Sequence, residues 1–265
     1  MTSVGLTRAP RGHYRFWYAA RMEWIKLRTL RSTWWTMGIT VAGAVAIGVA
    51  VGHNTKNASG DLTNNALAGM VPGLLLAGVL GVLVMTSEYS SGTIRATLAA
   101  VPGRPLLLAA KAAVFGAVTL VAGEVAAFVS FLAGEAALPH GMAAPALSQP
   151  GVLRAVLLTG TSFCLIGLLG LGLGAIIRHS PAAIGALVGG VYVVAQAIGA
   201  VSHGVGAYMP ILIVGNAIST TKPLSCGGPG PCPQPLPAWT GLGMLCLYAA
   251  VALAAGGWLL ARRDA

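Results

Sequence analysis

The stretch of sequence that decides the fold runs from residue 66 to residue 111 and reads ALAGMVPGLLLAGVLGVLVMTSEYSSGTIRATLAAVPGRPLLLAAK. Residues 66–86 are apolar, and a second apolar run begins at residue 106. A helix of about 20 apolar residues crosses the roughly 30 Å hydrocarbon core of a bilayer. The stretch therefore predicts two membrane-spanning helices joined by a polar, basic segment that stays on one face of the membrane.

The rest of the chain repeats this pattern, and its composition is typical of a membrane protein. Of its 265 residues, 56% are hydrophobic and 8% are charged, and the mean hydropathy is +0.79. A soluble domain of this composition could not cover its surface with polar groups. The runs lack the period-two alternation of barrel strands. The apolar runs long enough to cross a membrane are 34–51, 66–86, 106–133, 151–177, 182–201 and 238–260.

These observations predict an all-α integral membrane protein with a cytoplasmic N-terminal segment, 1–33, and a single six-span domain, 34–261. Cytoplasmic loops are enriched in lysine and arginine. With both termini inside, all basic residues except Lys56, Arg154 and Lys222 fall on the inner face. The net charge of +10 then reflects topology and contact with anionic lipid, and we expect no nucleic-acid partner. The richness in alanine, glycine and valine favours a bacterial cytoplasmic membrane.

The N-terminal segment carries no evident cleavable signal peptide, because its first apolar run starts only after 33 residues. Residues 14–31 predict an amphipathic helix that lies in the membrane interface, with Trp17, Ala20, Trp24 and Leu27 recurring at helical spacing. Two interpretations stay open: an anchor that orients the chain, or an element that grips a cytoplasmic partner. The candidate contact residues on this helix are Glu23, Lys26 and Arg28.

The polar segment between the second and third runs predicts a short helix across the inner face. Gly92 permits a sharp turn, and Thr93 to Ala100 can then form the helix. Proline and glycine at residues 102–105 end it. The order of residues is more specific than its basic character. The positions that carry this order are Glu88, residues 91–95, Thr97, Leu98, Pro102, Arg104 and Lys111.

This order resembles the cytoplasmic loop of type-2 ABC transporter permeases, and the six runs and basic N-terminal helix extend the resemblance over nearly the whole chain. Gly103 departs from the family pattern, which more often has serine or threonine there. The resemblance implies a permease subunit that pairs with a second permease copy or a similar permease and with two ABC ATP-binding subunits. The implied ATPase-coupling contacts are Glu88, Gly92, Thr93, Arg95 and Arg104.

The resemblance also implies an exporter, and the apolar spans favour a hydrophobic or amphipathic substrate. The sequence contains no Gly-x-x-x-x-Gly-Lys-Ser/Thr phosphate loop. We therefore expect that the chain is not an enzyme and binds no cofactor of its own, and that ATP and Mg²⁺ bind in the partner ATPase. An ion-coupled secondary transporter stays the alternative. An integral-membrane enzyme is disfavoured, because no catalytic set of polar residues gathers at one depth.

Several other residues are candidates for particular roles. Glu124 lies inside the third run, where a carboxylate is costly and often functional; it could face a substrate path or subunit seam, be protonated, or bond to Thr119 or Ser130. Cys226 and Cys232 lie in the outer segment 202–237 and could form a disulfide. The glycines of residues 167–174 predict close helix packing. The apolar residues 211–214 are too few to cross the membrane, and the resemblance implies a re-entrant element there. The scattered histidines predict no metal site.

Overall fold

The computed structural model describes residues 16–56, 61–100, 103–139, 142, 144–201, 203–220 and 236–262, which form helices joined by turns and contain no strand. The short helices are α1 (Phe16–Thr29), α3 (Leu62–Leu67), α5 (Thr93–Ala100), α10 (His203–Gly206) and α11 (Pro210–Ile218). The longer elements are α2 (Arg31–His53), α4 (Met70–Ser90), α6 (Arg104–Ala136), α7 (Val152–Ile177), α12 (Ala238–Arg262) and the continuous run α8 (Ser180–Ala186), η1 (Leu187–Val194) and α9 (Ala195–Val201).

Among the described residues, six helical segments are long and apolar enough to cross a membrane, as the sequence predicts. Their order matches the six predicted runs, but most boundaries are shifted by one to four residues. The first span begins at Arg31, immediately after α1, with Leu30 alone between the two helices. The third begins at Arg104, because Pro105 occupies the first turn of α6, where its missing amide donor costs nothing.

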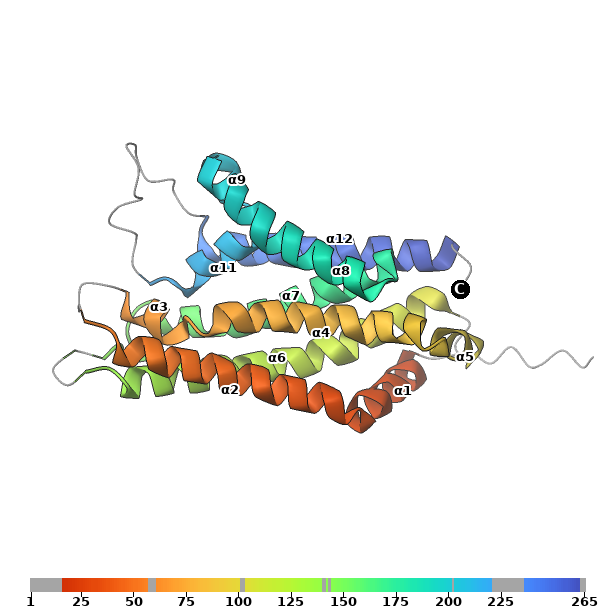
Figure 1. Ribbon diagram of the computed structural model, residues 1–265, viewed down its shortest axis with the longest axis horizontal. Coiled ribbons are helices and arrows are strands. Elements are labelled where there is room, and N and C mark those ends of the chain that lie inside the picture. Colours follow the sequence, from red (N-terminus) through yellow and green to blue (C-terminus); the bar gives the residue numbers. More distant parts are fainter. Residues whose placement is uncertain are drawn as a thin grey trace, which may run out of the picture.

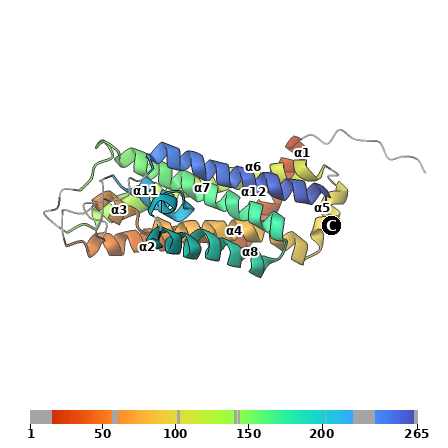
Figure 2. The same ribbon diagram turned by 90° about the horizontal axis from the view of Figure 1, so that it is seen from above.

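The centre of the bundle is α7, which packs against α4, α6 and α12 (Figure 2 shows it running between α12 and α6 on one side and α4 and α8 on the other). Glycines allow this packing. A side chain at Gly81 would place its Cβ 2.0 Å from the carbonyl oxygen of Gly167, and one at Gly170 would lie equally close to that of Gly78. The two backbones therefore touch, which confirms the predicted packing role of the glycines in residues 167–174.

The fifth span is the least enclosed of the six. Only 22% of its most apolar window is buried, against 72% for α7. Its middle, η1, is π-helical, and α9 leans away from α12 (Figure 1). Leu187 packs against α4 through Val82, and Ala183 joins the same small core. Most of this span therefore presents its side chains outward from the bundle.

One end of the bundle is closed by α3 and α11, and the other carries α1, α5 and the end of α12 (Figure 1). The predicted re-entrant piece is a helix, α11, whose Ile211, Ile213 and Val214 are buried. Asp61 joins α3 to the chain after α11, since its carboxylate caps α3 at Asn64 and accepts a 2.9 Å bond from the Thr220 hydroxyl. The predicted disulfide partners, Cys226 and Cys232, lie outside the described residues.

Candidate functional site

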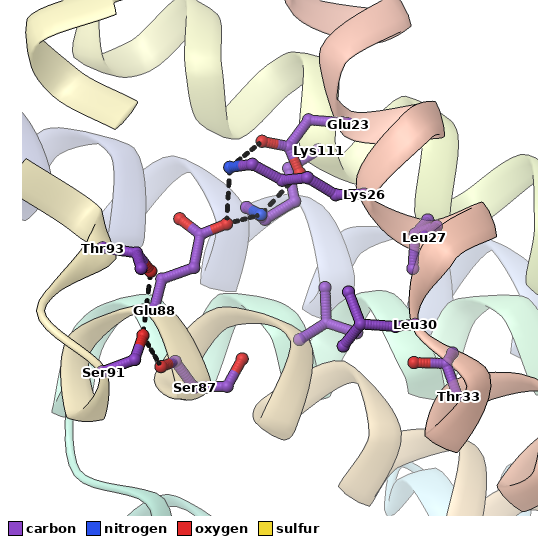
Figure 3. A pocket seen from close by; sticks show the side chains of 11 residues that line it. Glu23, Lys26, Leu27, Leu30, Thr33, Ser87, Glu88, Ser91, Thr93 and Lys111 are labelled. Carbon is purple, nitrogen blue, oxygen red and sulfur yellow. Dashed lines mark hydrogen bonds and ion pairs between the residues drawn. The ribbon is translucent and has the colours of Figure 1, made fainter. Parts of the chain in front are cut away.

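Four ionisable side chains meet at the α1/α5 end of the bundle (Figure 3). Glu23 and Lys26 come from α1, Glu88 from the last turn of α4, and Lys111 from the second turn of α6. The two residues of α1 are three positions apart, a spacing that puts both on one face of a helix. We call these four residues the ion cluster.

Carboxylates and ammonium groups alternate around the ion cluster. The Lys111 Nζ lies 2.6 Å from Glu23 Oε2 and 2.7 Å from Glu88 Oε1. The Lys26 Nζ lies 3.0 Å from Glu88 Oε1 and 3.3 Å from Glu23 Oε1. Each ammonium thus bridges the two carboxylates, and the positive and negative charges balance. Bonds in which both partners are charged are among the strongest hydrogen bonds in proteins.

Most of the ion cluster is withdrawn from solvent. Glu23 is 1% exposed, Lys111 3% and Glu88 8%. A buried charge costs several kcal/mol unless it is paired and hydrogen-bonded. Each of these three charges therefore depends on the others, so the ion cluster fixes the positions of α1, α4 and α6 relative to one another.

Lys26 is the partly exposed member of the ion cluster and its link to α5. Burial lowers the pKa of this ammonium, but the carboxylates of Glu23 and Glu88 raise it by more, so the pKa lies above its ordinary 10.5. Its Nζ also donates to the hydroxyl of Thr97 on α5 at 3.2 Å. That hydroxyl donates in turn to the Thr93 carbonyl at 3.1 Å. Lys26 is therefore charged at neutral pH and connects α1, α4 and α5.

The turn before α5 confirms the predicted role of Gly92. Its φ is +71°, in the left-handed region that favours glycine. The Ser91 hydroxyl bonds to the Ser87 carbonyl at 2.7 Å and lies 2.9 Å from the Thr93 hydroxyl. On α5 itself Ile94 is buried, whereas Arg95 is exposed. The turn therefore holds α5 against the bundle with a basic side chain outward.

Apart from Arg104, the predicted coupling contacts of the loop and the predicted contact residues of α1 divide into two groups. Gly92, Thr93 and Arg95 around α5, with Arg28 on α1, are exposed and can reach a partner directly. Glu23, Glu88 and, in part, Lys26 are engaged inside the chain, where they contact one another, Lys111 and Thr97. For these three residues, contact with another subunit stays a prediction, and an indirect role through the position of α1 and α5 fits their burial better.

Arg104 anchors the other end of the loop. Its Nη1 donates to the carbonyl oxygen of Leu260, near the end of α12, at 3.2 Å. Arg178 makes a parallel contact, because its Nη2 donates to Leu259 at 3.3 Å, and its guanidinium lies 5.3 Å from the centre of the Tyr89 ring. Both arginines thus satisfy carbonyl groups that the end of a helix leaves without intrahelical partners.

Sequence reasoning placed Lys111 in the loop motif and Arg178 on the same face, but it missed that Lys111 joins both carboxylates and that Arg178 contacts the end of α12 and Tyr89. The spacing of Glu23 and Lys26 along α1 was a usable signal, since it puts a carboxylate and an ammonium on one helix face. Nothing local paired Lys111 with Glu23, because the two residues are 88 positions apart.

A cavity of about 370 Å³ opens beside the ion cluster, between α1, the start of α2 and the end of α4 (Figure 3). Its wall is mostly apolar and includes Leu27, Leu30 and Val84, with the hydroxyls of Ser91 and Thr93 at one side. The exposed rings of Trp17 and Trp24 lie on the same helix as Leu27. The predicted apolar face of α1 is therefore divided, since Ala20 and Leu27 pack inward and the two tryptophans remain exposed.

Glu124 lies apart from the ion cluster, in the half of α6 that is farther from it. Its Oε1 is 3.0 Å from the hydroxyl of Thr161 on α7. The sequence had suggested Thr119 or Ser130 as partners, and this was wrong: their hydroxyls donate to backbone carbonyls of Phe115 and Ala66. Thr119 bonds the carbonyl four residues back in its own helix, and Ser130 bonds a carbonyl of α3, so the observed partner of Glu124 is Thr161 of the neighbouring helix.

Among the described residues, no group of histidine, cysteine, aspartate or glutamate side chains could hold a metal ion.

Comparison with known proteins adds no family assignment. No protein-family model matches the chain, and no curated protein matches it at a significant level.

Proposed function

We propose that this chain is the membrane-spanning permease subunit of an ATP-driven ABC transporter, placed in a bacterial cytoplasmic membrane with both termini inside. The observation that carries the proposal is the ion cluster, which joins a surface helix to two spans at one end of the bundle. A subunit without its own phosphate loop needs an external source of energy. The end with α1 and α5 offers a surface through which a soluble ATPase could act.

The mechanical path starts at α5. Arg95 is exposed there and Ile94 is buried, so a force on α5 reaches the bundle through an ordered turn. Lys26 then transfers it, because this ammonium binds Thr97 on α5 and Glu88 on α4. Lys111 extends the connection to α6. Closure of two ATP-binding subunits would move these elements together, as rigid-body transitions do.

The position of α1 fits an interfacial helix. Trp17 is 72% exposed and Trp24 44%, and both can lie at headgroup depth. The same helix buries Glu23 and Leu27 against the bundle. In this proposal α1 contacts lipid with its tryptophans and the ATPase with Arg28, and α5 is the cytoplasmic coupling helix.

The remaining partners follow from size and surface. Six spans enclose little space of their own, so a second permease copy or a similar permease completes the pathway. The sparsely buried fifth span leaves a large apolar surface that such a partner or lipid covers. The proposed activity is export of a hydrophobic or amphipathic substrate, with ATP and Mg²⁺ bound by the partner ATPase.

The test is to purify the chain in mild detergent with the ATPase that its host expresses alongside it, and to measure ATP hydrolysis by the complex. Arg95→Ala should lower hydrolysis while insertion and purification yield stay unchanged. Lys56→Ala is the matched control, because Lys56 is also exposed and basic but lies at the opposite end of the bundle. Glu88→Ala should lower hydrolysis indirectly, by releasing α1 and α5. Equal activity of the three variants and the original chain would remove the loop from the mechanism.

A second candidate, an ion-coupled secondary transporter, is favoured by one observation, the carboxyl group of Glu124 inside the membrane. It predicts proton-driven flux in vesicles that contain this chain alone. Flux without any ATPase, abolished by Glu124→Gln and unaffected by Arg95→Ala, would replace the permease proposal with this one.

A further inference from the structure

Glu124 is isolated from other charges. Between Lys111 and Glu135 it is the only charged residue of α6, and α7 carries none between Arg154 and Arg178. Among the described residues, Thr161 supplies the one hydrogen-bond partner of its carboxyl group. A carboxylate at this depth without a counter-ion is expensive, so its protonation state needs an explanation.

The hydrogen-bond contacts of Thr161 indicate that Glu124 is protonated. Its Oγ1 lies 2.9 Å from the Leu157 carbonyl oxygen and 3.0 Å from Glu124 Oε1. A threonine hydroxyl has one hydrogen and a carbonyl can only accept. Both contacts are hydrogen bonds if Thr161 donates to Leu157 and a protonated Glu124 donates to Thr161. With an ionised Glu124, the single hydroxyl hydrogen of Thr161 would have to serve both acceptors.

The surroundings of the second carboxyl oxygen also favour a protonated Glu124. Oε2 is buried and has no hydrogen-bond partner within the described part of the chain. The carboxyl group fills the space that Gly160 leaves, because a Cβ there would lie 2.5 Å from Glu124 Cδ and 2.6 Å from Oε2. A negative charge on an oxygen without a donor would carry the full desolvation cost, whereas the carbonyl oxygen of a neutral acid carries much less.

The acid lies at the lipid-facing edge of the bundle. Glu124 is itself half-buried, and its neighbours along α6, Val121 and Val125, are 65% and 54% exposed. On the neighbouring helix, α7, Leu157 is 40% exposed. An apolar molecule in the membrane can therefore pack on these side chains, beside the partly exposed Glu124.

We propose that Glu124 and Thr161 form a membrane-facing acid site that binds a lipophilic cation in exchange for a proton. The apolar body of the ligand packs on Val121 and Leu157 and its positive charge replaces the proton on Glu124. The acid gives its proton to water, and the carboxylate that remains pairs with the cation, so charge is conserved. That such a cation is also the exported substrate rests on the proposed permease function; the binding itself does not.

The test uses the full chain in lipid nanodiscs, without an ATPase. Dicyclohexylcarbodiimide, an apolar reagent to which protonated carboxyl groups add, is supplied at neutral pH, and the peptide that contains Glu124 is followed by mass spectrometry. Tetraphenylphosphonium is the cationic probe, and tetraphenylborate, which has the same shape and the opposite charge, is the control. Glu124→Gln identifies the labelled residue, and Glu135 reports on a carboxyl near the end of the same helix.

Modification of Glu124 should be slowed about tenfold by the phosphonium at roughly ten times its Kd, as expected for competition at one site, and should be unchanged by the borate. Absence of modification at Glu124 would overturn the protonated state. Modification that the phosphonium does not slow, up to its solubility limit, would overturn the cation site. Both the labelling of Glu124 and its slowing by the phosphonium are measured on the chain without substitutions. These results therefore hold even if Glu124→Gln fails to fold, and neither depends on finding an ATPase.

Discussion

Replacing Lys111 with methionine removes the charge at the centre of the ion cluster and keeps most of its apolar stem. The ammonium makes two short bonds, 2.6 Å to Glu23 and 2.7 Å to Glu88, and the residue is 3% exposed. After the change, two buried carboxylates face the single ammonium of Lys26. Breaking a buried ion pair from one side costs about 3–5 kcal/mol, so we expect a loss of unfolding free energy in that range.

The free energy of unfolding is measured by titrating the protein from mild detergent into dodecyl sulfate while tryptophan fluorescence is recorded. Lys56→Met is the control, because the exposed Lys56 lies at the far end of the bundle; a surface substitution of this kind changes stability by about 0.5 kcal/mol or less. Lys111→Met should also increase protease cleavage between α1 and α2, since α1 loses its strongest attachment to α6.

The pairing itself is tested by the double variant Lys111→Met with Glu23→Gln. This variant leaves the neutral pair of Lys26 and Glu88 at 3.0 Å. The double variant should lose less unfolding free energy than the two single variants lose in sum, by about 1–3 kcal/mol, the range for residues in one network. Additive losses, or a loss below about 1 kcal/mol for Lys111→Met alone, would refute the reasoning that the ion cluster holds this end together.

Three further predictions follow from the helices and the loop. Gly81→Ala places a Cβ against a backbone oxygen of α7 and should cost about 1–3 kcal/mol in the same titration, whereas Gly38→Ala, with no neighbour within 4 Å, should be neutral. Gly92→Ala has open space but keeps a φ of +71°, so it should cost about 1 kcal/mol from backbone strain and lower ATP hydrolysis by the complex. The pKa of Lys26 is raised on folding, so its contribution should be constant at neutral pH and disappear as the pH rises above 10.5 through the folded-state pKa; a Lys26→Met protein that loses the same stability over that pH range would contradict this.

Part of the candidate site was open to prediction because it depends on local sequence. Gly92 gives the turn, and residues 93–100 form the helix that was predicted. The partners of Glu88 could not be predicted from local sequence. Its predicted role was contact with another subunit, yet its Oε1 binds Lys26 and Lys111 within the chain. Lys26 is 62 positions away along the chain and Lys111 is 23, so both reach Glu88 only after the helices have packed.

By itself the sequence determined the number, order and approximate length of the spans, because the bilayer as solvent requires about 20 apolar residues for each helix. It did not determine which side of each span faces the protein. Lipid is as apolar as the interior of the bundle, so an apolar pattern does not separate the two. Tertiary structure alone decided that α7 is central, that Thr161 rather than Thr119 meets Glu124, and that Lys111 joins Glu23 to Glu88. These contacts depend on backbone approach at glycines and on the need to pair buried charges, and both arise only when distant segments meet.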